Sequence, residues 1–162
     1  MAESEDKSAT AATSKTTENA AQTGAPVVES PTIKDCVVVA EDSKPNREII
    51  VQNLKKLGFD VLIFDNGKKA WDEVSKTDKP VVAIFSDIMM PEMDGMEFLK
   101  HIRASEKYKS IPFVFVTAVM QRELIIEAKK LGTSGYLLKP ITSSTLQVKL
   151  KELFPNRKLA LS

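Results

Sequence analysis

The chain has 162 residues, of which 43% are apolar and 28% charged, and 23 basic and 22 acidic side chains leave a net charge of +1. This composition is typical of a soluble globular protein with one core. A charge near zero gives no general attraction to nucleic acid, and no apolar run approaches the roughly 20 residues that span a bilayer, so we expect neither nucleic acid nor a membrane as a partner. The single cysteine, Cys36, cannot form an internal disulfide, and the acidic N-terminus lacks the pattern of a secretory signal. We therefore expect a cytoplasmic protein.

The composition changes near residue 32. Residues 1–32 contain 7 Ala, 4 Ser and 6 Thr but no Leu, Ile, Phe, Tyr or Trp. Such a segment buries too little apolar surface to order itself, so we expect residues 1–32 to form a disordered, Ala/Ser/Thr-rich acidic tail. The tail carries a charge of −3, which leaves +4 on residues 33–162, the expected domain. We expect the tail to be a solvated extension rather than a segment that docks on the domain or on a partner.

Short runs of mostly β-branched or aromatic residues alternate with stretches of helical periodicity. There are five such runs, at residues 36–40, 61–64, 81–85, 111–116 and 136–138. They are continuous rather than alternating, which is typical of strands covered on both faces. Pro45 suits the first turn of a helix, and Gly58 and Gly132 stand where helices are expected to end.

A repeat of strand and helix with short connections predicts parallel strands joined by right-handed crossovers. The expected fold is therefore α/β, a doubly wound five-stranded parallel sheet of order 2-1-3-4-5 with helices on both faces, as in flavodoxin-like proteins. In such folds ligands bind beyond the carboxyl ends of the strands, here between the first and third strands.

Polar residues follow the predicted strands at this edge. Glu41 and Asp42 follow the first strand, Asp87 follows the third, and Thr117 and Lys139 follow the fourth and fifth. Three carboxylates so close together raise one another's pKa unless a cation lies among them. Carboxylate oxygens with no histidine and no available thiol suit Mg²⁺ or Mn²⁺.

The charges of this cluster balance with a divalent ion, because three carboxylates, Lys139 and the ion add to zero. A neutral pocket of this kind can accept a phosphoryl group, which the Thr117 hydroxyl and the Lys139 ammonium would orient. The carboxylate of Asp87 is the available nucleophile.

These residues also carry a family resemblance. The chain resembles a response-regulator receiver domain from about residue 34 to residue 154, and it is most similar to the single-domain chemotaxis members. The motifs are Glu41-Asp42, Ser86-Asp87 with Met90-Pro91-Glu92-Met93-Asp94-Gly95, Thr117-Ala118 and Lys139-Pro140. Each motif is weak alone, but together and in this order at the strand ends they are specific. The family also implies a cis peptide bond at Lys139-Pro140.

The resemblance implies that Asp87 accepts a phosphoryl group from a histidine kinase or a phosphotransfer protein. It implies that Asp42, Asp87 and the backbone carbonyl of Met89 bind Mg²⁺, and that Glu41 acts through water. The protein would be a signalling protein that catalyses only its own phosphorylation and slow dephosphorylation.

The resemblance also assigns a conformational switch. Lys139, Thr117 and the backbone of Ala118 would hold the phosphoryl oxygens. Thr117 and Tyr136 would form the switch pair, in which the hydroxyl moves to the phosphoryl group and the ring rotates into the space that it leaves. A downstream protein is then expected to bind the surface formed by Gln121 to Phe154.

Two positions depart from the chemotaxis members, in which polar side chains flank the path of the attacking water. Here these positions hold Met89 and Val119, and apolar side chains cannot orient water. We expect the phosphoryl group to persist longer than in that type.

Three alternatives remain open. The first is a pseudo-receiver, an interaction module that keeps the fold without phosphorylation. The second is an aspartyl phosphatase of the haloacid dehalogenase type, which would have a second acid at the position of Met89. The third is a flavodoxin-like cofactor binder, which would not place Glu41 and Asp42 against a phosphate.

Eight residues follow Phe154, so we expect no attached output domain. We also expect a monomer or weak dimer that signals through a separate partner.

Overall fold

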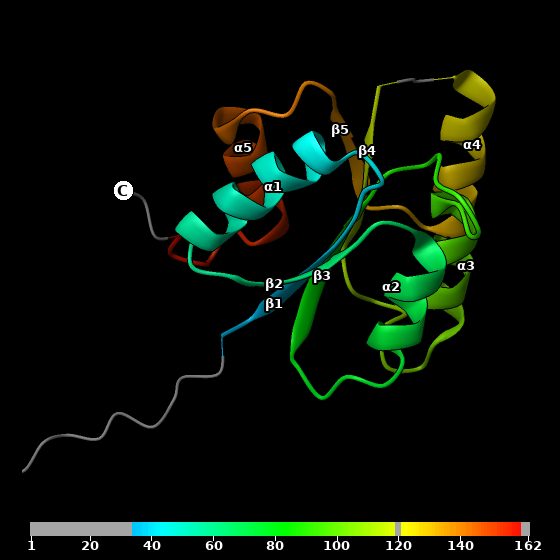
Figure 1. Cartoon of the computed structure of the whole chain (residues 1–162), viewed down its shortest axis with the longest axis horizontal. Coiled ribbons are helices and arrows are strands. Elements are labelled where there is room, and N and C mark those ends of the chain that lie inside the picture. The colour runs from blue at the N-terminus through cyan, green and yellow to red at the C-terminus, as the bar shows by residue number, and fades with distance from the viewer. Residues whose placement is uncertain (1–33, 119–120, 160–162) are drawn as a thin grey trace, which may run out of the picture. The chain divides into compact units, whose positions relative to one another are not determined.

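The computed structural model of the protein describes residues 34–118 and 121–159, in which strands and helices alternate (Figure 1). The predicted tail at residues 1–32 lies outside the described residues and stays a prediction. In chain order the elements are β1 (Cys36–Ala40), α1 (Lys44–Lys56), β2 (Asp60–Phe64), α2 (Gly67–Val74), β3 (Val81–Ser86), α3 (Gly95–Ala104), β4 (Phe113–Thr117), α4 (Arg122–Leu131), β5 (Gly135–Leu138) and α5 (Ser143–Leu153).

The strands form one parallel sheet of order β2-β1-β3-β4-β5, as the sequence predicts. Helices α1 and α5 cover one face of the sheet, and α2, α3 and α4 cover the other (Figure 1). The order reverses between β1 and β3, so these two strands end side by side. The doubly wound α/β fold is confirmed.

The sequence of the central strand β1 is apolar at every position because both of its faces are buried. Val37 and Val39 pack in a core on the α1 and α5 face, whereas Val38 and Ala40 pack in a second core on the opposite face. All five residues of β1 are fully buried. A strand buried on both faces cannot show the alternation of a half-buried strand.

The expectation that every strand is covered on both faces is wrong for the two outer strands, β2 and β5. Ile63 of β2 is 42% exposed and Leu138 of β5 is 53% exposed, because each outer strand has a neighbour on one side only. The fourth strand also begins later than predicted, at Phe113 rather than Ile111. Pro112, which lies between them, has no N–H for a sheet hydrogen bond, although its carbonyl accepts one from Ile84.

Local signals set the ends of several helices. The side chains of Asn66, Asp94 and Thr142 each accept a hydrogen bond from the backbone N–H three residues later, at the starts of α2, α3 and α5. After α1 and α4, Gly58 and Gly132 have φ angles of 97° and 90°, which only glycine adopts readily. The predicted helix ends at both glycines are confirmed.

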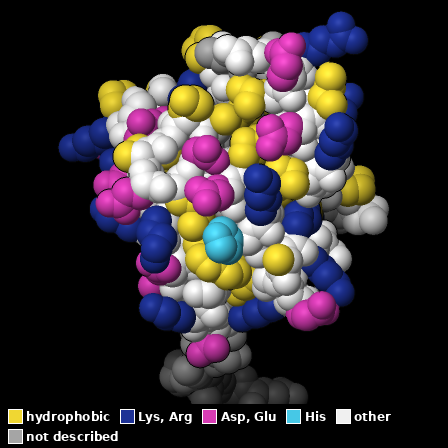
Figure 2. Space-filling model, turned by 90° about the vertical axis from the view of Figure 1, so that its right-hand side faces the viewer, with side chains coloured by type: hydrophobic (Ala, Val, Ile, Leu, Met, Phe, Trp, Pro, Cys, Tyr) yellow, Lys and Arg dark blue, Asp and Glu magenta, His cyan; other side chains and the backbone are white. Residues whose placement is uncertain are grey.

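The described surface is mixed in charge. On the face formed by α2, α3 and α4, basic, acidic and hydrophobic side chains are interspersed (Figure 2). Among the described residues, every helix is too short or too polar to cross a membrane.

Candidate functional site

Three carboxylates meet at the carboxyl edge of the sheet. Ala40 of β1 pairs with Ser86 of β3, and the Asp87 N–H donates a 2.9 Å hydrogen bond to the Ala40 carbonyl. The residues that follow the two strands therefore leave the sheet together. Glu41, Asp42 and Asp87 each offer an oxygen, and these oxygens all lie within 4.8 Å of one another. The sequence-predicted acidic cluster is thus assembled by the reversal in strand order.

Lys139 reaches this cluster from the end of β5. Its Nζ donates a 3.0 Å hydrogen bond to Oδ2 of Asp87 and lies 3.0 Å from Oε2 of Glu41. Its backbone N–H donates to the Thr117 carbonyl, which extends the pairing of β4 and β5. Burial alone lowers the pKa of Lys139, but the hydrogen bonds and charges of Asp87 and Glu41 outweigh it and raise that pKa. Lys139 therefore stays cationic beside two acids.

Glu41 is a buried acid, and its burial opposes its ionisation. Its side chain is 1% exposed, and this burial raises its pKa from 4.5 to about 7. Hydrogen bonds from Lys139 and the Ser43 N–H lower the pKa, whereas the charge of Asp87 raises it further. A cation that enters the cluster would favour the ionised form of Glu41 and lower its pKa.

The cluster fits a hard divalent cation. Within the described part of the chain, the buried Oε2 of Glu41 accepts no hydrogen bond with acceptable geometry, although Lys139 is close. Three carboxylates exceed the single positive charge beside them. Oxygen donors of this kind are the ligands of Mg²⁺ and Mn²⁺. The residues present therefore match the predicted ion.

The loop after Asp87 has a steric reason for its sequence. The Gly95 N–H donates a 2.8 Å hydrogen bond to the Ile88 carbonyl, which folds the loop back on itself. A Cβ at Gly95 would overlap the Asp87 carbonyl oxygen and would lie 2.9 Å from the Phe115 ring. Glu92 turns the chain with a φ of 67°. The Met-Pro-Glu-Met-Asp-Gly motif is thus the segment that holds Asp87 at the edge.

A cavity of about 540 Å³ opens beside Asp87. Thr117 in its wall is only 4% exposed, whereas Met89 is 71% exposed. Val119 lies outside the described residues. The cavity therefore brings together the predicted acceptor and phosphoryl-binding residues, Asp87, Thr117, Ala118 and Lys139. The rest of its lining consists of Ile88, Met89, Gln121 and Leu124.

Tyr136 lies apart from this cavity, at the junction of β5 and α4. Its hydroxyl donates a 3.0 Å hydrogen bond to the Ile125 carbonyl, and its ring stacks on Phe115 with the centroids 6.2 Å apart. Burial of the half-buried ring raises the pKa of the hydroxyl. The ring thus links α4 to the strand that ends at Thr117, and its role as a switch stays a prediction.

The sequence matches the response regulator receiver domain over residues 37–151. That span includes every residue of the acidic cluster and the cavity. The chain belongs to the response-regulator receiver family. Receiver domains of this type are signalling modules rather than classical enzymes. The cis peptide bond that the family implies is present between Lys139 and Pro140.

Chemotaxis proteins are prominent among the relatives of this receiver domain. It is 37% identical over 118 residues to a chemotaxis protein CheY homolog of Campylobacter jejuni, a match that covers 72% of this chain and 90% of the relative. It is 38% identical over 119 residues to the chemotaxis protein CheY-3 of Vibrio cholerae, with 73% and 90% covered.

Solved structures agree. CheY4 of Vibrio cholerae superposes with a TM-score of 0.70 at 30% identity, covering 75% of this chain and 99% of that one. The receiver domain of the sensor histidine kinase PA1611 of Pseudomonas aeruginosa, solved with a magnesium ion coordinated in its active-site cleft, gives a TM-score of 0.68 at 25% identity, with 76% and 99% covered. This receiver is therefore of the CheY type.

One residue of the site was not predicted from the sequence. Arg47, in the first turn of α1, donates a 2.6 Å hydrogen bond to the Glu41 carbonyl. Its only signal in the sequence is a position one helical turn after Ser43, where the helix follows the acidic loop. Contacts of a side chain with backbone carbonyls leave no pattern in the sequence.

Proposed function

We propose that this receiver domain acts as a response regulator that accepts a phosphoryl group on Asp87 from a histidine kinase or a phosphotransfer protein. The observation that supports this best is the position of Asp87, which lies within the three-carboxylate cluster and accepts a 3.0 Å hydrogen bond from Lys139. A nucleophilic carboxylate beside a fixed cation and a cation site suits phosphoryl transfer.

In the proposed reaction, a carboxylate oxygen of Asp87 bonds to the phosphorus atom while the bond from phosphorus to the donor histidine nitrogen breaks. The imidazole leaves and takes a proton from solvent. The Thr117 hydroxyl, the Ala118 N–H and the Lys139 ammonium hold the phosphoryl oxygens. Support comes from the cavity beside Asp87, because all three residues line it.

Mg²⁺ or Mn²⁺ would be held by Asp42, Asp87 and the backbone carbonyl of Met89, with Glu41 acting through water. The ion would supply positive charge that neutralises the carboxylates and the transferred group. The magnesium ion in the related receiver domain of PA1611 supports this choice of ion. The closeness of the three carboxylates, which have one lysine beside them, supports it from this chain.

Phosphorylation would act on the surface from Gln121 to Phe154. In the proposed switch, Thr117 moves to the phosphoryl oxygens and Tyr136 follows it. The exposed apolar side chains on this surface, Ile126, Leu138 and Val148, are 43%, 53% and 55% exposed and support it as the place where a downstream protein binds.

The phosphoryl group is proposed to persist longer than in the fast chemotaxis type. Met89 stands at the mouth of the cavity and is 71% exposed, so its apolar side chain lies where water enters. The sequence has Val119 at the second of these positions, so neither position offers a polar side chain that could orient water.

Phosphorylation of the intact protein by an acyl phosphate, such as acetyl phosphate, tests the proposed function. With Mg²⁺ present, we expect mass spectrometry to show the addition of one phosphoryl group, which chelation of the ion or the Asp87→Ala substitution abolishes. Asp94→Asn is the matched control, since Asp94 caps α3 nearby but lies outside the cluster. Unchanged incorporation in Asp87→Ala would contradict the proposal.

The pseudo-receiver is the alternative that this experiment separates. It predicts no phosphoryl addition to the wild type and no effect of Mg²⁺, while the fold remains intact. The proposed signalling is of the chemotaxis type or of the shuttle type, and identification of the proteins that bind the phosphorylated form distinguishes these two.

A further inference from the structure

Arg47 contacts the backbone of the loop that carries two of the three carboxylates. Its Nη1 donates a 2.6 Å hydrogen bond to the carbonyl of Glu41, and the same nitrogen lies 3.4 Å from the carbonyl of Asp42. One guanidinium group therefore ties down both residues whose side chains enter the acidic cluster. A short hydrogen bond from a charged donor is among the stronger ones in proteins.

The other contacts of the loop leave Asp42 dependent on its backbone. Glu41 is held by its N–H, which donates to the Phe64 carbonyl, and by its side chain, which accepts from the Ser43 N–H. Among the described residues, no donor contacts the carboxylate of Asp42, which is exposed. The place of that side chain in the cluster therefore depends on the loop backbone, which Arg47 contacts.

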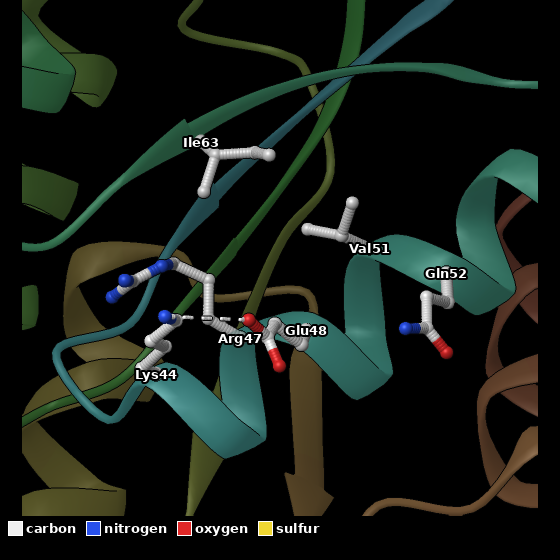
Figure 3. A pocket seen from close by; sticks show the side chains of 6 residues that line it. All are labelled: Lys44, Arg47, Glu48, Val51, Gln52 and Ile63. Atoms are coloured by element: carbon white, nitrogen blue, oxygen red, sulfur yellow. Dashed lines mark ion pairs between the residues drawn. The ribbon is translucent and has the colours of Figure 1, made fainter.

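Arg47 does not act as half of an ion pair. Within the described ranges no carboxylate lies within ion-pair distance of its guanidinium, whereas its neighbours Lys44 and Glu48 pair with each other at 4.0 Å. Figure 3 shows these three side chains on α1, in a groove that Ile63 of β2 lines from the opposite side. The hydrogen bonds of Arg47 therefore go to the loop carbonyls, which an alanine could not reach. Its charge also acts on Asp65, whose pKa is lowered mainly by the hydrogen bond from Lys69 and to a smaller extent by Arg47.

We propose that Arg47 is a positioning residue of the metal site, which holds the acidic loop so that Asp42 and Glu41 face Asp87. This inference rests on the proposed function, since it concerns the same cation. It concerns a residue that acts on the site through the backbone and does not touch the ion.

Charge and position predict opposite effects at Arg47. If only its charge mattered, removing a cation near three carboxylates would strengthen the binding of Mg²⁺. If it positions the loop, removal frees the backbone of two ligand residues, and binding weakens because the loop must be ordered each time an ion binds. The sign of the change in affinity therefore decides between the two roles.

The test is the affinity of the full-length protein for Mg²⁺, measured by isothermal titration calorimetry in Arg47→Ala, Arg47→Lys and Lys44→Ala variants. We expect Arg47→Ala to weaken binding about tenfold, the equivalent of one hydrogen bond to a charged group. Arg47→Lys should recover part of this loss. Lys44→Ala is the matched control, because it removes the same charge from the same groove without touching the loop, and its affinity should be equal to or tighter than that of the wild type.

Amide chemical shifts of residues 41–43, recorded without Mg²⁺, supply a readout that a general loss of stability would not move. We expect these amides to shift or broaden in Arg47→Ala while those of the amino edge of the sheet stay unchanged. Equal or tighter Mg²⁺ binding in Arg47→Ala would overturn the inference. If the wild type itself bound no Mg²⁺, the proposed function would fail instead, so the two failures are distinguishable.

Discussion

The two ends of the parallel strands treat their carboxylates in opposite ways. At the amino end, Asp60 pairs with Lys79 at 2.9 Å and Asp35 pairs with Arg157, one cation to each acid. At the carboxyl end Glu41 and Asp87 share Lys139, and Asp42, the third acid of the cluster, has no ion pair among the described residues. The pKa values follow this difference, since the hydrogen bond from Lys79 lowers that of Asp60 whereas burial raises that of Glu41 to about 7.

This difference in charge pairing distinguishes the amino end of the sheet from the carboxyl end, which holds the candidate site. The amino end also closes around aromatic contacts, because Arg157 lies over the Phe59 ring and Phe59 packs against Phe154. These groups pair with one another, so each of the two acids, Asp35 and Asp60, has its own cation. The carboxyl end keeps unbalanced charge in a buried place, which is unfavourable for the metal-free fold but suits a cation and a phosphoryl group.

The largest expected effect on stability comes from replacing glycines at the two ends of the sheet. Gly95→Ala at the carboxyl end should lower the free energy of unfolding by about 3 kcal/mol or more, because the new Cβ meets the Asp87 carbonyl and neither backbone can yield. Gly132→Ala at the amino end should cost about 1–2 kcal/mol, the strain of a left-handed alanine, since its Cβ meets only the flexible Arg103 side chain. Urea unfolding measures both, and equal losses would contradict this steric account.

Glu41→Gln should stabilise the metal-free protein. The pKa of Glu41 is raised, so the folded state keeps a proton that the unfolded chain releases, and stability falls as pH rises from about 4.5 to about 7. Above this window the substitution should raise the free energy of unfolding by about 1–3 kcal/mol at roughly pH 8, and the pH dependence should flatten. The same variant should bind Mg²⁺ more weakly. A wild type whose metal-free stability rises across this window would refute the assignment.

Met89→Asn should shorten the lifetime of the phosphoryl group about tenfold, because an amide at the mouth of the cavity can orient water. The decay of phosphorylated protein after removal of the acyl phosphate, followed by mass spectrometry, measures this lifetime. Met89→Leu keeps an apolar side chain of similar size and should leave the lifetime unchanged. Equal lifetimes in all three proteins would exclude Met89 as a determinant.

Asp60→Asn at the amino end should have the smallest effect, since the pair that it breaks is largely exposed. We expect the Tm to fall by less than about 2 °C. The pKa of Asp60 is lowered by Lys79, so its contribution is present above the ordinary value of 3.8 and disappears as pH falls through the lower folded value. Thermal unfolding of both proteins at neutral and acidic pH checks this, and a loss as large as that of Gly95→Ala would overturn the contrast between the two ends.

The fold could be predicted from periodicity because each central strand is buried on both faces and each helix on one. The signal was weaker where tertiary position decides exposure. Ile63 and Leu138 are as apolar as the central strands but lie at the two edges, so their exposure depends on strand order rather than on local sequence. Pro112 shows the reverse case, in which local sequence decides. It lies within an apolar run, but because it has no backbone N–H the strand begins only after it, at Phe113.

The residues of the site can be predicted from the sequence, because the residue that follows each strand must lie at one edge of a parallel sheet. The sequence therefore predicts that Glu41, Asp42, Asp87 and Lys139 lie together. Only the tertiary structure decided how they are held and what that does to their charge. The pKa of Glu41 depends on burial from all sides, and the hold of Arg47 on the acidic loop depends on where a helix turn meets two carbonyls. Both are contacts in space, which the order of residues along the chain does not encode directly.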